Sequence, residues 1–172
     1  KTNPPPPVAY TTISDADSPL GPPTGEGTWW VPAGSTTVQV SIFKATSTLS
    51  ADTITGLTLE RGAGDSDLNV NISTINLWLD NGNNRWDSGD VNVGTATASN
   101  IFTSSATFSG LNLGSPTSGA STYIVTLNVK SIAAGTQDGA QIRLRVSTAV
   151  CSNILTFPVA DIVDATIRID TA

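Results

Sequence analysis

Residues 121–131 have the sequence STYIVTLNVKS, in which Tyr123, Val125, Leu127 and Val129 recur at every second position. Successive side chains of a β-strand point to opposite faces of the sheet, so residues spaced by two share one face. The stretch therefore predicts a strand whose apolar face is directed into a core.

A second segment shows the same alternation more sharply. Ile142, Leu144 and Val146 fall on one face, and Arg143 and Arg145 fall on the other. An antiparallel sheet with one face on the core and one in water has this pattern. We predict strands at 37–44, 53–61, 74–79, 91–97, 105–111, 121–131, 140–148 and 153–169, the last divided at Pro158. The predicted core also contains Phe43, Leu57, Leu59, Leu77, Leu79 and Phe108.

No helical period is present, and turn-forming residues separate the apolar runs. These features predict an all-β protein, an Ig-like antiparallel β-sandwich of about 8–9 strands. The first 34 residues have a different composition, because prolines and glycines interrupt them repeatedly. We therefore divide the chain into an extended, Pro-rich N-terminal arm at 1–34 and a sandwich domain at 35–172.

Two patches of the arm have apolar or β-forming character. The first contains Val8, Tyr10 and Ile13, and the second contains Trp29 and Trp30. Apolar side chains of this size are costly to leave in water. We expect both patches to dock, either on this domain or on a neighbouring molecule, and we treat them as the candidate assembly residues.

The sequence DNGNNRWDSGD occupies residues 80–90, between two predicted strands. Calcium prefers six to eight oxygen ligands, and short carboxylate and amide side chains on a glycine-containing loop can supply them. The EF-hand pattern is absent. The candidate ligands are Asp80, Asn81, Asn83, the carbonyl of Arg85, Asp87 and Asp90. The alternative is a metal-free loop in which these side chains bond only to their own backbone, as in Asx-turns.

Residues 77–94, LWLDNGNNRWDSGDVNVG, resemble the LYLDxNGDGxxDxGDxxLG segment of many secreted bacterial and archaeal surface proteins. The segments SIFKA at 41–45, ADTITGLTL at 51–59, ATFSGL at 106–111 and STYIVTLNV at 121–129 are similar to the strands around that segment. The resemblance covers about 38–150 and implies an Ig-like sandwich whose loop binds Ca²⁺. Asn83 and Asn84 replace the usual Asp-Gly, so we expect weaker binding than in those relatives.

Several single residues have two interpretations. Asn71 begins an Asn-x-Ser sequon, which permits glycosylation only if the side chain is exposed. Asp65 and Asp67 are expected in a solvated turn, with a further ligand for the acidic loop or a second metal site as the alternative. Trp86 is expected to pack beneath the acidic loop rather than to stack on a sugar. Cys151, the single cysteine, is expected to be a small buried residue, with an interchain disulfide as the alternative.

Composition excludes some functions. The formal net charge is −6 and the few Lys and Arg do not cluster, so we expect no nucleic-acid partner. No apolar run reaches 18 residues, so we expect no membrane span. Histidine is absent, and the clustered carboxylates already belong to the predicted metal loop, so we do not expect an enzyme.

These features together predict a structural subunit of an extracellular or cell-surface assembly, such as a filament, pilus-like fibre, surface layer or adhesin. In this hypothesis calcium stiffens the loop, and the arm links copies into a homopolymer by adding a strand to a neighbour. The alternative is a carbohydrate-binding or spacer module of a larger secreted enzyme, with the Pro-rich stretch as its linker.

Overall fold

The computed structural model describes residues 3–16, 27–156 and 165–172. The strands in chain order are β1 (Tyr10–Asp15), β2 (Gly27–Pro32), β3 (Val38–Ser47), β4 (Asp52–Arg61), β5 (Ile72–Leu79), β6 (Val91–Ala96), β7 (Ser105–Ser115), β8 (Ser121–Val129), β9 (Gln141–Ile142), β10 (Leu144–Val150), β11 (Ile154–Thr156) and β12 (Ala165–Asp170). Two short helices, α1 (Leu68–Asn71) and the 3₁₀ turn η1 (Ile132–Ala134), complete the set. Neither helix is long or apolar enough to cross a membrane.

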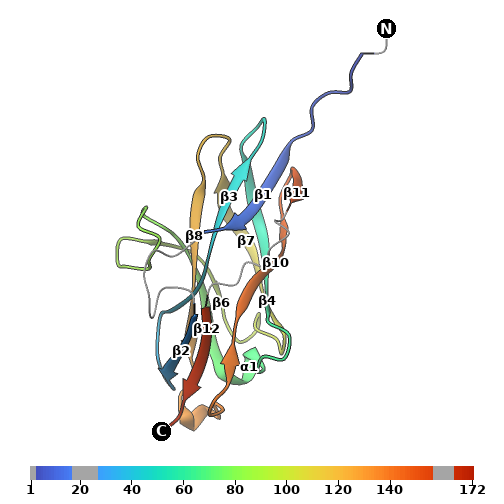
Figure 1. The fold of residues 1–172 in the computed structure, drawn as a ribbon. Coiled ribbons are helices and arrows are strands. Elements are labelled where there is room, and N and C mark those ends of the chain that lie inside the picture. The colour runs from blue at the N-terminus through green and yellow to red at the C-terminus, as the bar shows by residue number, and fades with distance from the viewer. Residues whose placement is uncertain (1–2, 17–26, 157–164) are drawn as a thin grey trace.

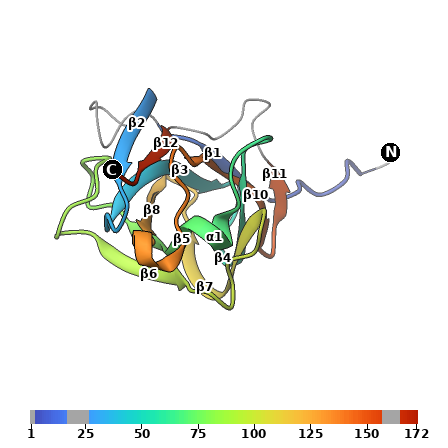
Figure 2. The ribbon, with the colours of Figure 1, turned by 90° about the horizontal axis from the view of Figure 1, so that it is seen from below.

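The strands form two layers around one core. Six of them make a sheet in the order β11-β1-β3-β8-β5-β6 (Figure 1). The others form β10-β4-β7 and β2-β12-β9, and only Arg143 separates β9 from β10 in the chain. Seen along the long axis, β1 and β3 lie on one side of the molecule and β4 and β7 on the opposite side (Figure 2). Val125, Leu59 and Ile167, one from each sheet, are fully buried in the same cluster.

The predicted all-β sandwich is confirmed, and every predicted strand is present within a few residues of its expected bounds. The described residues contain twelve strands rather than eight or nine, because the arm supplies two and Arg143 separates β9 from β10. The predicted division at Pro158 lies outside the described residues. Leu79 corrects the predicted core: it is 37% exposed. It is the last residue of β5 and pairs with Val91, which is also exposed, so this end of the strand lies outside the core.

Both apolar patches of the predicted arm are strands of the sandwich. Strand β1 pairs antiparallel with β3 and parallel with β11, and β2 pairs parallel with β12. The division at residue 34 is therefore not a boundary between a free arm and the sandwich. The physical reason is burial, since Ile13 and Val31 have apolar side chains that the core accepts at 0% and 6% exposure.

The two parallel pairs depart from the purely antiparallel sheet that we predicted. A parallel pair needs a long connection between its strands. β1 with β11, and β2 with β12, join opposite ends of the chain, so nearly the whole domain is that connection. The C-terminal strand is thereby held on both sides, because β12 also pairs with β9.

A buried ion pair joins the turn after β4 to the junction of β9 and β10. The Asp65 side chain is 0% exposed and accepts hydrogen bonds from the backbone N–H, Nε and Nη2 of Arg143 and from Nε2 of Gln141. This corrects the expected solvated turn at Asp65. Asp67 does face solvent, at 45% side-chain exposure, in a pair with Arg61.

We expect Asp65→Ala to lower the free energy of unfolding by about 3 kcal/mol, because it removes the carboxylate from a buried charge pair. Urea denaturation measures this. Asp67→Ala is the matched control and is expected to cost less than about 1 kcal/mol, since its pair is partly exposed to solvent. Equal losses in the two variants would contradict the assignment of Asp65 as a buried structural charge.

Candidate functional site

The acidic loop, residues 80–90, joins β5 to β6, the last two strands of the six-stranded sheet. It projects from the side of the molecule (Figure 1). Oδ2 of Asp80 accepts a hydrogen bond from the Gly82 N–H at 3.0 Å, and Oδ1 accepts one from the Asn84 N–H at 3.0 Å. Asn84 has φ 59°, a conformation that Asn tolerates better than most residues. Asp80 thus folds the first half of the loop around its own carboxylate.

Asp90 and Asp87 organise the second half. Asp90 is 9% exposed and accepts hydrogen bonds from the N–H groups of Asn81 at 3.0 Å and Asp87 at 2.8 Å. Asp87 accepts from the Gly89 N–H and from the side-chain amides of Asn83 and Asn81. These bonds, that of Gly89 first, lower the pKa of the Asp87 carboxyl. All three carboxylates are therefore engaged by donors of the loop itself.

The acidic loop contains carboxylate and amide oxygens, and a calcium ion needs six to eight oxygen ligands. The oxygens are of the type that calcium prefers, but each carboxylate oxygen already accepts at least one hydrogen bond. Within the described ranges, no group of three or more His, Cys, Asp or Glu side chains is placed to hold a metal ion. The loop is ordered by Asx-type hydrogen bonds to its backbone and by the bonds of Asn81 and Asn83 to Asp87. A calcium ion in this loop stays a prediction.

Two tryptophans attach the loop to the outer face of the sheet. The Trp78 and Trp86 rings meet edge to face, with centroids 5.7 Å apart. Both pack on a small cluster formed by Ala16, Ile42 and Ile124. This confirms that Trp86 packs beneath the loop.

Polar contacts reinforce that attachment. Oε1 of Gln39, a 4%-exposed residue of β3, accepts a hydrogen bond from the Trp86 N–H at 2.8 Å. Trp78 Nε1 donates to the Thr126 hydroxyl at 2.8 Å. The loop is therefore anchored on β3, β5 and β8 at once.

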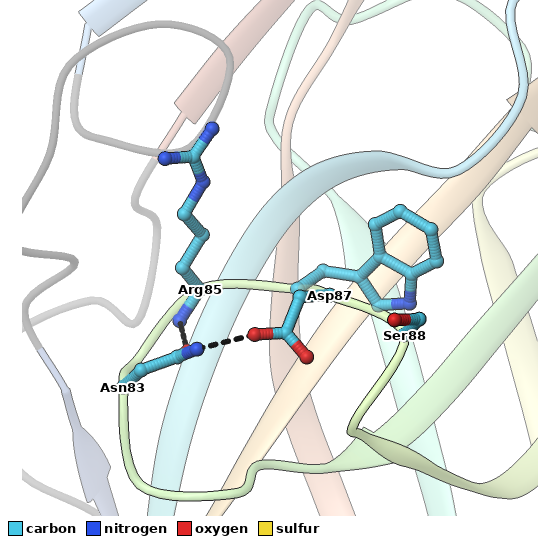
Figure 3. Close-up of a pocket in the computed structure, with 5 residues that line it drawn as sticks. Asn83, Arg85, Asp87 and Ser88 are labelled. Carbon is cyan, nitrogen blue, oxygen red and sulfur yellow. Dashed lines mark hydrogen bonds between the residues drawn. The ribbon is translucent and has the colours of Figure 1, made fainter.

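A hollow of about 620 Å³ lies against the loop and is lined by Asn83, Arg85, Trp86, Asp87 and Ser88. Figure 3 shows Asn83 between the Arg85 backbone and the Asp87 carboxylate, while the Arg85 guanidinium points away from Asp87. The hollow is open to solvent, and the Asn83 side chain is bonded to both the Asp87 carboxylate and the Arg85 backbone N–H. Its chemistry is that of a structured loop rather than of a reaction site.

The candidate assembly residues occupy different environments. Ile13 is buried and Trp29 packs partly against the core. Val8, Tyr10 and Trp30 are exposed by 50%, 39% and 61%. Burial therefore divides the two patches, with one side chain of each held in the sandwich and the others at the surface.

The sequon residue Asn71 is fully buried at the end of α1. Its Nδ2 atom donates to the Asp67 carbonyl at 2.9 Å and to Oε1 of Gln137 at 3.3 Å. Its Oδ1 atom accepts from the Gln137 N–H at 2.9 Å. The exposure that glycosylation requires is not met in the folded domain.

Sequence reasoning missed Asp52, which ties β1 to the rest of the domain. Its carboxylate accepts hydrogen bonds from the Thr11 hydroxyl and from the N–H groups of Thr53, Ser152 and Asn153. Burial opposes ionisation, but these bonds, that of Asn153 first, outweigh it and lower the pKa of Asp52 from 3.8 to about 2. Its stabilising effect is complete above the unfolded value and is lost as the pH falls toward 2. No motif marks Asp52, because all its donors except Thr53 come from segments far away in sequence.

Cys151 lies next to this group and is half-buried. Its thiol donates to the Asn153 carbonyl at 3.4 Å. Burial, and secondarily the nearby Asp52 charge, raises the pKa of the Cys151 thiol. A thiol that resists ionisation is a poor nucleophile, so this environment fits a structural cysteine.

No protein-family model matches the sequence, and no curated protein is similar to it. Nine solved chains match the structure. One is the solution structure of CaCohA2 from Clostridium acetobutylicum, with 9% identity, a TM-score of 0.35, and coverage of 95% of this chain and 91% of that chain. Another is a crystal structure of a CaDoc0917–CaCohA2 complex, with 10% identity, a TM-score of 0.34, and coverage of 94% and 99%. These values are too low for an inference from either structure to this chain.

Proposed function

We propose that this chain is a structural subunit of an extracellular assembly, such as a filament, surface layer or adhesin, whose copies are linked by exchange of strand β1. The observation that supports the proposal is the position of β1. The first strand of the chain fills a place between β3 and β11 in the six-stranded sheet. A second copy can supply the same strand to the same place, as in domain swapping.

The connection after β1 favours such an exchange. Residues 16–26 separate β1 from β2, and they include Pro19, Pro22 and Pro23 with two glycines. A connector of this length spans roughly 40 Å when extended. Strand exchange would use this reach to place β1 in a neighbouring sheet while β2 stays paired with β12 of its own domain.

The segment before β1 supports the same function. Residues 3–8 are exposed and extend away from the body of the protein (Figure 1). Pro4 to Pro7 cannot donate backbone hydrogen bonds, so this segment is unsuited to continue β1 as a ladder. Among the described residues before β2, the strand that pairs is Tyr10–Asp15, which is short enough for one neighbouring sheet to accept.

Disulfide trapping between full-length chains tests the exchange. Thr12 on β1 pairs with Thr46 on β3. Thr12→Cys and Thr46→Cys chains, each also carrying Cys151→Ser, are mixed under conditions in which the wild type assembles. A disulfide between positions 12 and 46 can then form only between molecules. We expect a covalent dimer on a non-reducing gel, with the linked peptides identified by mass spectrometry.

The control replaces Thr46→Cys by Thr107→Cys, which lies on β7 in the other layer. It reports random collision between assembled chains. Ordered assemblies seen by negative-stain microscopy with no 12–46 link above this control would refute strand exchange.

We also propose that the acidic loop binds Ca²⁺ weakly and is stiffened by it. The three carboxylates lie on one short loop, and the hydrogen bonds that now engage them would have to be shared with the ion. Since binding to the native state stabilises it by mass action, millimolar calcium is expected to raise the melting temperature and a chelator to reverse the rise.

Asp87→Asn is expected to remove the calcium-dependent rise in melting temperature, while Asp138→Asn, on an exposed turn outside the loop, is expected to keep it. Differential scanning fluorimetry of the three proteins with and without calcium is sufficient. An unchanged melting temperature of the wild type over this calcium range would exclude the site.

A specific observation favours carbohydrate binding as a second candidate function. Trp30 on β2 is 61% exposed, and the Arg168 guanidinium lies 6.0 Å from its ring centroid. An exposed aromatic face beside a hydrogen-bond donor is suited to a sugar ring.

If this face binds sugar, Trp30→Ala is expected to lose retention on cellulose or chitin in a pull-down assay. Phe102→Ala, at another exposed aromatic residue, is the control; no retention of the wild type would dismiss this function.

A further inference from the structure

The place that β1 occupies in the six-stranded sheet has a polar end and an apolar end. At the polar end, the Thr11 hydroxyl donates to Oδ2 of Asp52 at 2.8 Å and lies 3.0 Å from the Ser47 hydroxyl. Ser47 in turn donates to the Ser115 hydroxyl at 2.9 Å. Thr11, Ser47 and Ser115 are 0%, 6% and 1% exposed, so this is a buried network.

Two residues further along β1, the surroundings are apolar. Ile13 is 0% exposed, belongs to the main core cluster and pairs with Ala45 of β3. The groove that receives β1 therefore presents hydroxyl and carboxylate groups to one inward side chain and aliphatic surface to the next. A strand fits when a hydroxyl residue precedes a large aliphatic residue by two positions.

Apolar alternation alone leaves one alternative register open. A slip by one residue would turn Ile13 outward, which the core excludes. A slip by two residues that pairs Thr12 with Thr48 would place Asp15 beside Ala45, and burial of that charge excludes it. The opposite slip, which pairs Thr12 with Lys44, keeps the same face inward. It places Ala9 at the polar end and Thr11 at the apolar end.

That last register is disfavoured by polar chemistry. Ala9 cannot donate a hydrogen bond to Asp52 or meet the Ser47 hydroxyl, and Thr11 would take its hydroxyl into the aliphatic site. Buried polar groups left without partners are costly. We infer that Asp52, with Ser47 and Ser115, selects the β1 strand of a second copy in a single register by its Thr11-x-Ile13 pattern. This inference rests on the proposed strand exchange.

Asp52 is suited to this selection because the protein fixes it from several sides. The N–H groups of Thr53 and Asn153 each donate to it at 2.8 Å, and that of Ser152 donates at 3.2 Å. These donors belong to β4 and to the turn before β11, so three hydrogen bonds to the carboxylate come from outside β1. The incoming strand needs to supply only the Thr11 hydroxyl.

Disulfide mapping within one chain tests the register independently of assembly. In a Cys151→Ser background, Thr12→Cys is combined either with Thr46→Cys for the observed register or with Lys44→Cys for the displaced one. Each pair is made with Thr, Val, Ala or Ser at position 11. Folded monomer is isolated by size exclusion, oxidised, and its intramolecular disulfide quantified by mass spectrometry.

With Thr11 or Thr11→Ser, we expect linkage at 12–46 and almost none at 12–44. With Thr11→Val, which keeps the shape and removes the hydroxyl, the 12–44 linkage is expected to rise at least tenfold, and Thr11→Ala is expected to do the same. Ser14→Ala, on the other face of β1, is the control and should leave the register unchanged.

Exclusive 12–46 linkage in both hydroxyl-free variants, at the wild-type yield, would overturn register selection by Asp52 and leave strand exchange between copies untouched. If neither hydroxyl-free variant folds while the Thr11→Ser chain does, the hydroxyl is required for insertion of β1, which supports the inference. Conversely, a register shift in a protein that forms no intermolecular 12–46 link would uphold the selection and refute the exchange.

Discussion

Buried backbone N–H and C=O groups need hydrogen-bond partners, and in this sandwich that need joins the two ends of the chain. β1 lies between β3 and β11, and β12 lies between β2 and β9. Two of the three sheets thus contain a strand from the first 32 residues paired in parallel with one from the last 20. The domain closes only when both ends are in place, which makes the terminal strands the part of the fold that another molecule can most readily supply.

Several aspartate carboxylates each accept hydrogen bonds from more than one backbone N–H group. Asp80 and Asp90 fold the acidic loop, and Asp52 holds the turn before β11 together with β1. A carboxylate that accepts several N–H groups stays ionised and fixes the geometry of the segments that donate to it. The same chemistry explains why the acidic loop is ordered by its own hydrogen bonds, and why calcium would have to share ligands that are already in use.

Local patterns predicted much of the fold. The alternation through Tyr123 and Val129 and the alternation of Ile142 with Arg143 gave strands where the structure has them, because a period of two is a local property of a half-buried strand. The packing of Trp86 was also predictable. The environments of three other residues could not be predicted. That of Leu79 depends on where β5 ends. Those of Asp65 and Asn71 depend on partners distant in sequence, Arg143 and Gln137.

By itself, the sequence determined the all-β class, the positions of most strands and the composition of the acidic loop, since turn residues and alternation act over a few neighbours. Only the tertiary structure decided that Tyr10–Asp15 and Gly27–Pro32 belong to the sandwich and that each pairs in parallel with a C-terminal strand. The contact of Thr11 with Asp52 was also decided there. Those contacts join residues separated by tens of positions to more than a hundred. Their energy depends on burial and hydrogen bonding that exist only once both layers have assembled.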